Sequence, residues 1–277
     1  PAKAGKHVLT VYVVRSTQDM RWGVRGASGV NVLRIKGVKV GAGAKPLAAA
    51  PRKKWALIVG DSITEGIGVK DLGSYSTLIG QGLQELDYEY GVSACGYSGW
   101  LCKGDRRGDV PAYYMITEAV AGKGGKYNDA ASRWNKIDAN TSLLDASGRI
   151  SASGKTGQEP SIILVNYGTN EALRMRDKGS DIAASMAQSL RALRKAAPNA
   201  HIYYLVPFGQ YWAREIHAVV TAYQAENPKD KLVSVIDLGD KVANSLRKQG
   251  YWGSLHPNNL ACSILATKIL AKIVSTK

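Results

Sequence analysis

Apolar runs and amphipathic stretches alternate from Trp55 onward, and this alternation constrains the fold more than any other feature. The apolar runs are typical of short buried strands, and the stretches between them have the three- and four-residue spacing of helices. Strands that alternate with helices predict an α/β fold with a parallel sheet covered on both faces. Such sheets bind ligands outside the carboxyl ends of their strands. Strands are expected at 55–59, 88–94, 161–168, 201–207 and 232–238, and helices at 75–86, 180–197 and 258–274.

The first 50 residues have a different pattern. Residues 7–17 and 30–40 alternate β-branched and polar side chains, which favours strands, and small residues and prolines at 42–54 are typical of a linker. Two or three strands cannot build a core of their own. We therefore expect residues 1–50 to form a β-strand segment and its linker, as a partial β-sandwich. Residues 51–277 are expected to form a larger domain.

The alternation is interrupted between 103 and 159, a stretch rich in Gly, Asp, Lys and Ser. Long segments of this kind are commonly functional or mobile. The sequence predicts an insertion between two strands, with one helix near 110–120.

The net charge of +15 indicates either a solvated basic face or attraction to an acidic partner. Basic residues are spread along the chain, and no zinc-finger, RNA-binding or helix-turn-helix pattern accompanies them, which argues against nucleic acid. No run of 18 apolar residues occurs, so no membrane span is expected. Cys95 and Cys102 are either a local disulfide or two buried thiols, and with Cys262 they lack zinc-ligand spacing.

Three polar motifs stand where the predicted fold would place a site. Ser62, in G-D-S-I-T-E-G, directly follows the first strand and is either a helix N-cap or a nucleophile beside backbone donors. Asn170, in G-T-N-E, follows another strand and is either a turn residue or a donor to an oxyanion. His256, in S-L-H-P, precedes the last helix and becomes a candidate general base if it reaches Ser62.

Together with G-Y-S-G at 96–99, these motifs occur in the order found in the SGNH, or GDSL-type, hydrolase superfamily, which residues 55–277 resemble. The resemblance implies a flavodoxin-like α/β/α fold and ester hydrolysis through an acyl-enzyme, without metal or cofactor. By position, Ser62 would be the nucleophile and His256 the general base. The amides of Ser62 and Gly99 and the side chain of Asn170 would form the oxyanion hole, with Gly96 a weaker candidate for the glycine.

Two positions depart from the family pattern. Gly253 stands where the family has an aspartate three residues before the histidine, and Glu171 stands where an aspartate follows the asparagine. An acid at the first position would orient the imidazole. Three alternatives remain for His256: a backbone carbonyl that makes a Ser–His dyad, which we favour; Asp237 or Asp240 from the preceding strand end; or an impaired site.

The N-terminal segment, with V-V-R-S-T-Q-D before its β run, is similar to carbohydrate esterase family two. Members of that family carry a β-sandwich before the hydrolase domain and deacetylate plant-type polysaccharides, and some lack the triad aspartate. This resemblance implies a secreted or periplasmic esterase that removes O-acetyl groups from a polysaccharide or oligosaccharide. Alternatives are an O-acetyltransferase, a lipase or a thioesterase on the same fold, or a non-catalytic glycan-binding protein.

Four aromatic residues lie near the proposed site in the sequence. Aromatic rings at a cleft stack on the apolar faces of sugars, but they also pack as ordinary partly buried side chains. The candidates for substrate binding are Trp100, Tyr211, Trp212 and Trp252.

Overall fold

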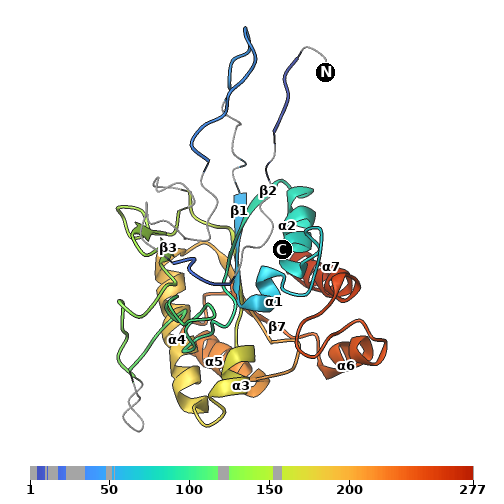
Figure 1. The fold of residues 1–277 in the computed structure, drawn as a ribbon. Coiled ribbons are helices and arrows are strands. Elements are labelled where there is room, and N and C mark those ends of the chain that lie inside the picture. Colours follow the sequence, from blue (N-terminus) through green and yellow to red (C-terminus); the bar gives the residue numbers. More distant parts are fainter. Residues whose placement is uncertain are drawn as a thin grey trace.

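The computed structural model describes residues 5–9, 11, 18–22, 35–47, 52, 54–117, 125–151 and 158–276. Its centre is a sheet of five parallel strands in the order β2-β1-β5-β6-β7 (Figure 1). This confirms the parallel α/β fold expected from the alternation of strands and helices. The strands are β1 (Lys54–Gly60), β2 (Tyr88–Ala94), β5 (Ile162–Asn166), β6 (His201–Leu205) and β7 (Val233–Ile236).

Helices cover both faces of the sheet and give the molecule three layers. Along β1, successive side chains point to opposite faces, as the pleat of a strand requires. Ala56 and Ile58 belong to the core that includes residues of α2 (Tyr75–Gln84) and α7 (Asn259–Ser275). Leu57 and Val59 belong to the opposite core, with α4 (Gly179–Ala196) and α5 (Ala213–Glu226).

Three shorter helices complete this domain. The one-turn helix α1 (Ser62–Glu65) follows β1, and α3 (Thr169–Arg174) follows β5. Both helices therefore begin at the carboxyl edge of the sheet, where the sequence predicts a site. Helix α6 (Asp240–Lys248) lies between β7 and α7. None of the described helices is long and apolar enough to cross a membrane.

The insertion contains extended chain and a small antiparallel pair, β3 (Lys136–Asp138) with β4 (Thr141–Ser142). The helix expected near 110–120 is wrong over 110–117, while 118–120 lie outside the described residues. Val110, Ala112 and Ile116 each form an isolated bridge to another part of the insertion. All three side chains are buried. Buried residues that make backbone bridges to other segments suit extended chain better than a helix.

The N-terminal segment forms no strand in its described residues. Residues 7–9, 11 and 35–40 are extended, with Val8, Leu9 and Val38 mostly exposed. Figure 1 shows extended stretches of this segment projecting away from the sheet. The rest of the two expected β runs, at 10, 12–17 and 30–34, lies outside the described residues. Division of the chain at residue 50 stays a prediction.

Candidate active site

The end of β1 presents Ser62 at the edge of the sheet. Asp61 is the N-cap of α1, and its Oδ1 accepts a hydrogen bond of 3.0 Å from the Ile63 amide. Gly60 permits the tight turn, because an added Cβ would lie 1.9 Å from Thr64 Oγ1 and 2.8 Å from the Asn166 carbonyl oxygen. Ser62 thus becomes the first residue of the helix.

His256 reaches Ser62 from the loop before α7. The imidazole Nε2 lies 2.9 Å from the hydroxyl oxygen of Ser62, although 194 residues separate the two. The loop is held by a hydrogen bond of 3.0 Å from the Gly253 amide to the His256 carbonyl. Across the site, Gly68 leaves space for the histidine, since an added Cβ would lie 2.9 Å from His256 Cβ. A hydroxyl in hydrogen-bond contact with an imidazole is the arrangement that activates a serine nucleophile.

The two acids proposed to orient this imidazole each have other hydrogen-bond partners. Asp237 accepts hydrogen bonds from Gln210 and from the Gly239 amide, and it pairs with His217 at 3.3 Å. Asp240 accepts a hydrogen bond of 2.7 Å from Asn244 on its own helix. Both carboxylates thus have partners other than His256, and the hypothesis that one of them replaces the missing aspartate stays a prediction.

Asn170 is the second residue of α3 and is 5% exposed. Its side-chain amide donates a hydrogen bond of 2.9 Å to the carbonyl of Ser98. This bond fixes the orientation of the amide and leaves its second N–H for another acceptor. The Ser62 amide is the first N–H of α1, and such groups have no acceptor inside their helix. Both groups have the chemistry to stabilise an oxyanion.

The Gly99 amide is used within its own turn, where it donates a hydrogen bond of 3.0 Å to the Cys102 carbonyl. The prediction that this amide lines the oxyanion hole is therefore not met in this structure. Gly99 has a different reason to lack a side chain. An added Cβ would lie 2.0 and 2.2 Å from the two carboxylate oxygens of Glu171.

Glu171 organises this turn, a role that the sequence does not reveal. Its Oε1 accepts hydrogen bonds from the amides of Leu101 at 3.1 Å and Cys102 at 3.0 Å. Burial raises the pKa of Glu171, against the opposing effect of these amides. Burial likewise raises the pKa of Asp61 to about 7, and the nearby charge of Glu171 adds to the shift. The buried carboxyl groups of Asp61 and Glu171 thus support the backbone around the site. The one sequence signal for the role of Glu171 is that it stands where the family has an aspartate.

Two of the four aromatic candidates are packed into the protein. Trp100 is 1% exposed and stacks on Tyr204, and Trp252 is 7% exposed and meets Phe208 edge to face. Neither ring is available to a sugar, so their predicted role in substrate binding is wrong: both serve the core. Tyr211 and Trp212 are half-buried. The indole N–H of Trp212 donates a hydrogen bond of 2.9 Å to the carbonyl of Gly168, which caps α3.

Cys95, Cys102 and Cys262 are buried free thiols. Of the two alternatives for Cys95 and Cys102, the structure has the thiols. Burial raises the pKa of Cys95 to about 11, which keeps that thiol protonated and unreactive. Within the described ranges, no group of three His, Cys, Asp or Glu side chains is placed to hold a metal ion.

A family model for GDSL-like lipases and acylhydrolases matches residues 58–261, a span that includes Ser62, Asn170 and His256. The chain belongs to the GDSL-like lipase/acylhydrolase family. No curated protein matches the sequence. In this member of the family, Ser62, Asn170 and His256 have the geometry described above.

Solved structures share the fold of this GDSL-like chain at low identity. An active-site mutant of a family two carbohydrate esterase from Clostridium thermocellum is 16% identical, with a TM-score of 0.56 over 82% of this chain and 65% of that one. An acetyl xylan esterase from Butyrivibrio proteoclasticus is 19% identical, with a TM-score of 0.52 over 83% of this chain and 65% of that one. A salicylyl-acyltransferase from a tetracycline biosynthetic pathway is 16% identical, with a TM-score of 0.51 over 86% and 59%. The chain thus spans slightly less than two thirds of the length of the two esterases.

Proposed function

We propose that this protein is a serine esterase that removes O-acetyl groups from a polysaccharide or oligosaccharide. The observation that carries the proposal is the contact of 2.9 Å between Ser62 Oγ and His256 Nε2 at the carboxyl edge of the sheet. The fold shared with carbohydrate esterases supports a glycan substrate. The half-buried rings of Tyr211 and of Trp212, which contacts the start of α3, are suited to the apolar face of a sugar. A glycan outside the cell would place the enzyme in a secreted or periplasmic location.

The proposed reaction needs only groups of the protein and water. His256 takes the proton of Ser62 as the hydroxyl oxygen attacks the acetyl carbonyl carbon, and the carbonyl oxygen becomes an oxyanion. The Ser62 amide and the second N–H of Asn170 stabilise that charge. His256 then protonates the sugar oxygen as its bond to the acetyl carbon breaks. Water, deprotonated by His256, attacks the acyl-enzyme; as the bond from the acetyl carbon to Ser62 Oγ breaks, His256 returns the proton to Oγ and acetate leaves.

In this mechanism Ser62 and His256 act as a dyad. The tautomer that accepts the serine proton at Nε2 carries its own proton on Nδ1. We propose that a backbone carbonyl accepts this Nδ1 proton in place of the aspartate that Gly253 replaces. The hydrogen bond between the Gly253 amide and the His256 carbonyl and the close approach of Gly68 support this proposal, because both hold the backbone that carries the ring.

Acyl transfer is the second candidate, because an acyl-enzyme at Ser62 can pass its acyl group to a sugar hydroxyl as well as to water. The fold shared with a salicylyl-acyltransferase supports it. An assay with an acyl donor and a glycan acceptor separates the two, since transfer gives an acetylated glycan and hydrolysis gives free acetate.

The test is acetate release from acetylated xylan and from an aryl acetate by the wild type, by Ser62→Ala and by Ser263→Ala. Ser263 lies on the exposed face of α7 and serves as the matched serine control. The proposal predicts release by the wild type and by Ser263→Ala, with a loss of about 10⁴-fold or more in Ser62→Ala. Equal release by all three proteins would contradict a role for Ser62.

A further inference from the structure

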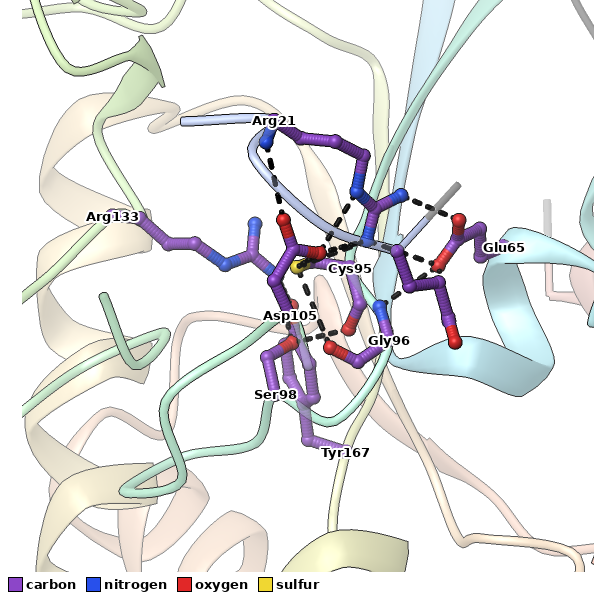
Figure 2. A network of polar contacts seen from close by, with 9 residues as sticks. Arg21, Glu65, Cys95, Gly96, Ser98, Asp105, Arg133 and Tyr167 are labelled. Atoms are coloured by element: carbon purple, nitrogen blue, oxygen red, sulfur yellow. Dashed lines mark hydrogen bonds and ion pairs between the residues drawn. The ribbon is translucent and has the colours of Figure 1, made fainter. Parts of the chain in front are cut away.

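A short piece of the N-terminal segment, residues 18–22, lies against the sheet domain, in contrast to the exposed residues 7–9 and 35–40. Gln18 and Arg21 both donate hydrogen bonds to Glu65 on α1. Figure 2 shows Arg21 between Glu65 and Asp105. The Gln18 carbonyl accepts a hydrogen bond of 2.9 Å from the Arg106 amide, which anchors the piece on the insertion. We call residues 18–22 the strap.

Arg21 bridges two buried carboxylates from different parts of the chain. Its Nη1 pairs with Glu65 Oε1 at 2.5 Å, and its Nε donates to Asp105 Oδ1 at 2.8 Å. The side chain of Glu65 is 7% exposed and that of Asp105 is fully buried, so both charges depend on this partner. Burial alone would lower the pKa of Arg21, but the two carboxylates outweigh burial and raise it. The guanidinium is therefore a fixed positive charge.

The same two carboxylate residues hold Gly96 at both of its backbone groups. Glu65 Oε2 accepts a hydrogen bond of 2.8 Å from the Gly96 amide, and the Asp105 amide donates one of 2.8 Å to the Gly96 carbonyl. A side chain at Gly96 would collide with the strap, because an added Cβ would lie 1.6 Å from Gln18 Nε2. The absence of a side chain at Gly96 thus allows the strap to pack against this turn. This accounts for the glycine that was the weaker candidate for the oxyanion hole.

Both ends of this network lead to the proposed catalytic groups. Glu65 is the last residue of α1, three positions after Ser62. On the other side, Gly96 begins the turn in which the Ser98 carbonyl accepts the side-chain amide of Asn170. Through Arg21, the strap fixes the distance between the nucleophile and the turn that orients the oxyanion donor.

We propose that the strap is part of the catalytic unit and that Arg21 is a positioning residue for the reaction at Ser62. The inference rests on the proposed function, because positioning is measured through hydrolysis. Removal of the guanidinium leaves two buried carboxylates without their cation, and their repulsion separates α1 from the Gly96 turn. A displacement of about 1 Å at a reacting group costs on the order of 10²-fold in rate.

The test compares Arg21→Met, Arg21→Lys and Arg194→Met. Arg194 is a matched control, because it pairs with Asp230 at 2.8 Å with 15% of its side chain exposed, against 14% for Arg21, and it joins α4 to the start of β7 away from the site. The measurements are kcat and KM on an aryl acetate well below each variant's Tm, and hydrogen exchange of peptides that cover 62–66 and 95–99.

We expect Arg21→Met to lose about 10- to 100-fold in kcat with KM within about twofold of the wild type, and to exchange faster at 95–99. Arg21→Lys keeps the charge and should retain part of the lost rate. Arg194→Met should lower Tm without a change in kcat. The inference is overturned if Arg21→Met keeps its kcat, or if Arg194→Met loses as much. If the wild type hydrolyses no ester, the proposed function fails. In that case, unchanged hydrogen exchange at 95–99 in Arg21→Met would separately overturn the proposal that Arg21 positions this turn.

Discussion

The carboxylate of Glu171 occupies the space where a side chain at Gly99 would lie. The added Cβ would come within 2.0 Å of Glu171 Oε1, and the same oxygen accepts the amides of Leu101 and Cys102. Gly99 and Glu171 thus form a close pair that sets the path of the turn beside Asn170. The exchange of aspartate for glutamate at 171 supplies a longer side chain, which reaches this turn from α3.

Gly99→Ala tests this close contact. The new methyl group has to displace a buried carboxylate, so we expect a loss of about 1–3 kcal/mol in the free energy of unfolding. The displacement also breaks the hydrogen bonds to Leu101 and Cys102, and kcat should fall with it. Denaturant unfolding measures the first effect. Gly91→Ala is the control, since an added Cβ there would meet only Trp55, at 4.0 Å. Gly250→Ala is unsuitable, because the positive φ of 73° at that position strains any side chain. A Gly99→Ala protein as stable as Gly91→Ala would contradict the account.

Asn170→Ala removes the side-chain donor proposed for the oxyanion. Loss of one such donor lowers kcat by about 10²–10³-fold, with little change in KM. Asn244→Ala, at a half-buried position on α6, is the matched control and should keep the wild-type kcat. Steady-state kinetics on an aryl acetate decide the matter: a normal kcat in Asn170→Ala would exclude the assigned role.

Asp61 predicts how stability depends on pH. Its pKa lies near 7 in the folded protein, against 3.8 when exposed, because of burial and then the charge of Glu171. Below pH 3.8 both states hold the proton. Between 3.8 and about 7 the unfolded chain releases it and the folded chain keeps it, so rising pH lowers the free energy of unfolding. Above pH 7 the loss is complete, at an upper bound of about 4 kcal/mol.

Asp61→Asn removes this titration and keeps an N-cap acceptor for the Ile63 amide. We expect the variant to be more stable than the wild type above pH 7, with a smaller decline between pH 4 and pH 7. Urea unfolding of both proteins across this range provides the measurement. Parallel stability curves for the two proteins would show that Asp61 is ionised throughout.

Gly253→Asp restores a carboxylate at the position where the family has one. The backbone tolerates a side chain there, because an added Cβ would meet only the His256 carbonyl oxygen, at 3.4 Å. If the dyad already seats the imidazole, kcat should rise by less than about tenfold, whereas an impaired site would gain orders of magnitude. Ser254→Asp places the same charge on the neighbouring exposed residue and is the control. A gain above about 100-fold in Gly253→Asp alone would refute the dyad.

The strands and helices that build the sheet domain could be predicted because they depend on the local spacing of apolar residues. Ser62 and His256 were found for a related reason: Ser62 directly follows the first strand, His256 lies in the loop before the last helix, and parallel topology brings such positions to one edge of the sheet. The helix expected near 110–120 failed because extended chain can bury the same residues. The sequence pattern also could not predict the direction of a side chain, as Trp100 and Trp252 show, because both pack inward.

Contacts between distant segments were the second kind of feature that the sequence could not reveal. Arg21 and Glu65 lie 44 residues apart and carry charges that are ordinary at any surface. Only the fold shows that both are largely buried and paired. The same holds for Gly99, where the motif suggested an amide donor and the structure shows a contact with Glu171.

The most direct test of the account is to trap the acyl-enzyme. The wild type would be mixed with an aryl acetate, quenched in acid during turnover, digested and examined by mass spectrometry. We predict the added mass of one acetyl group on the peptide that contains Ser62, absent in Ser62→Ala. Turnover without acetylation of Ser62, or acetylation that persists on another residue in Ser62→Ala, would contradict the claim that Ser62 is the nucleophile.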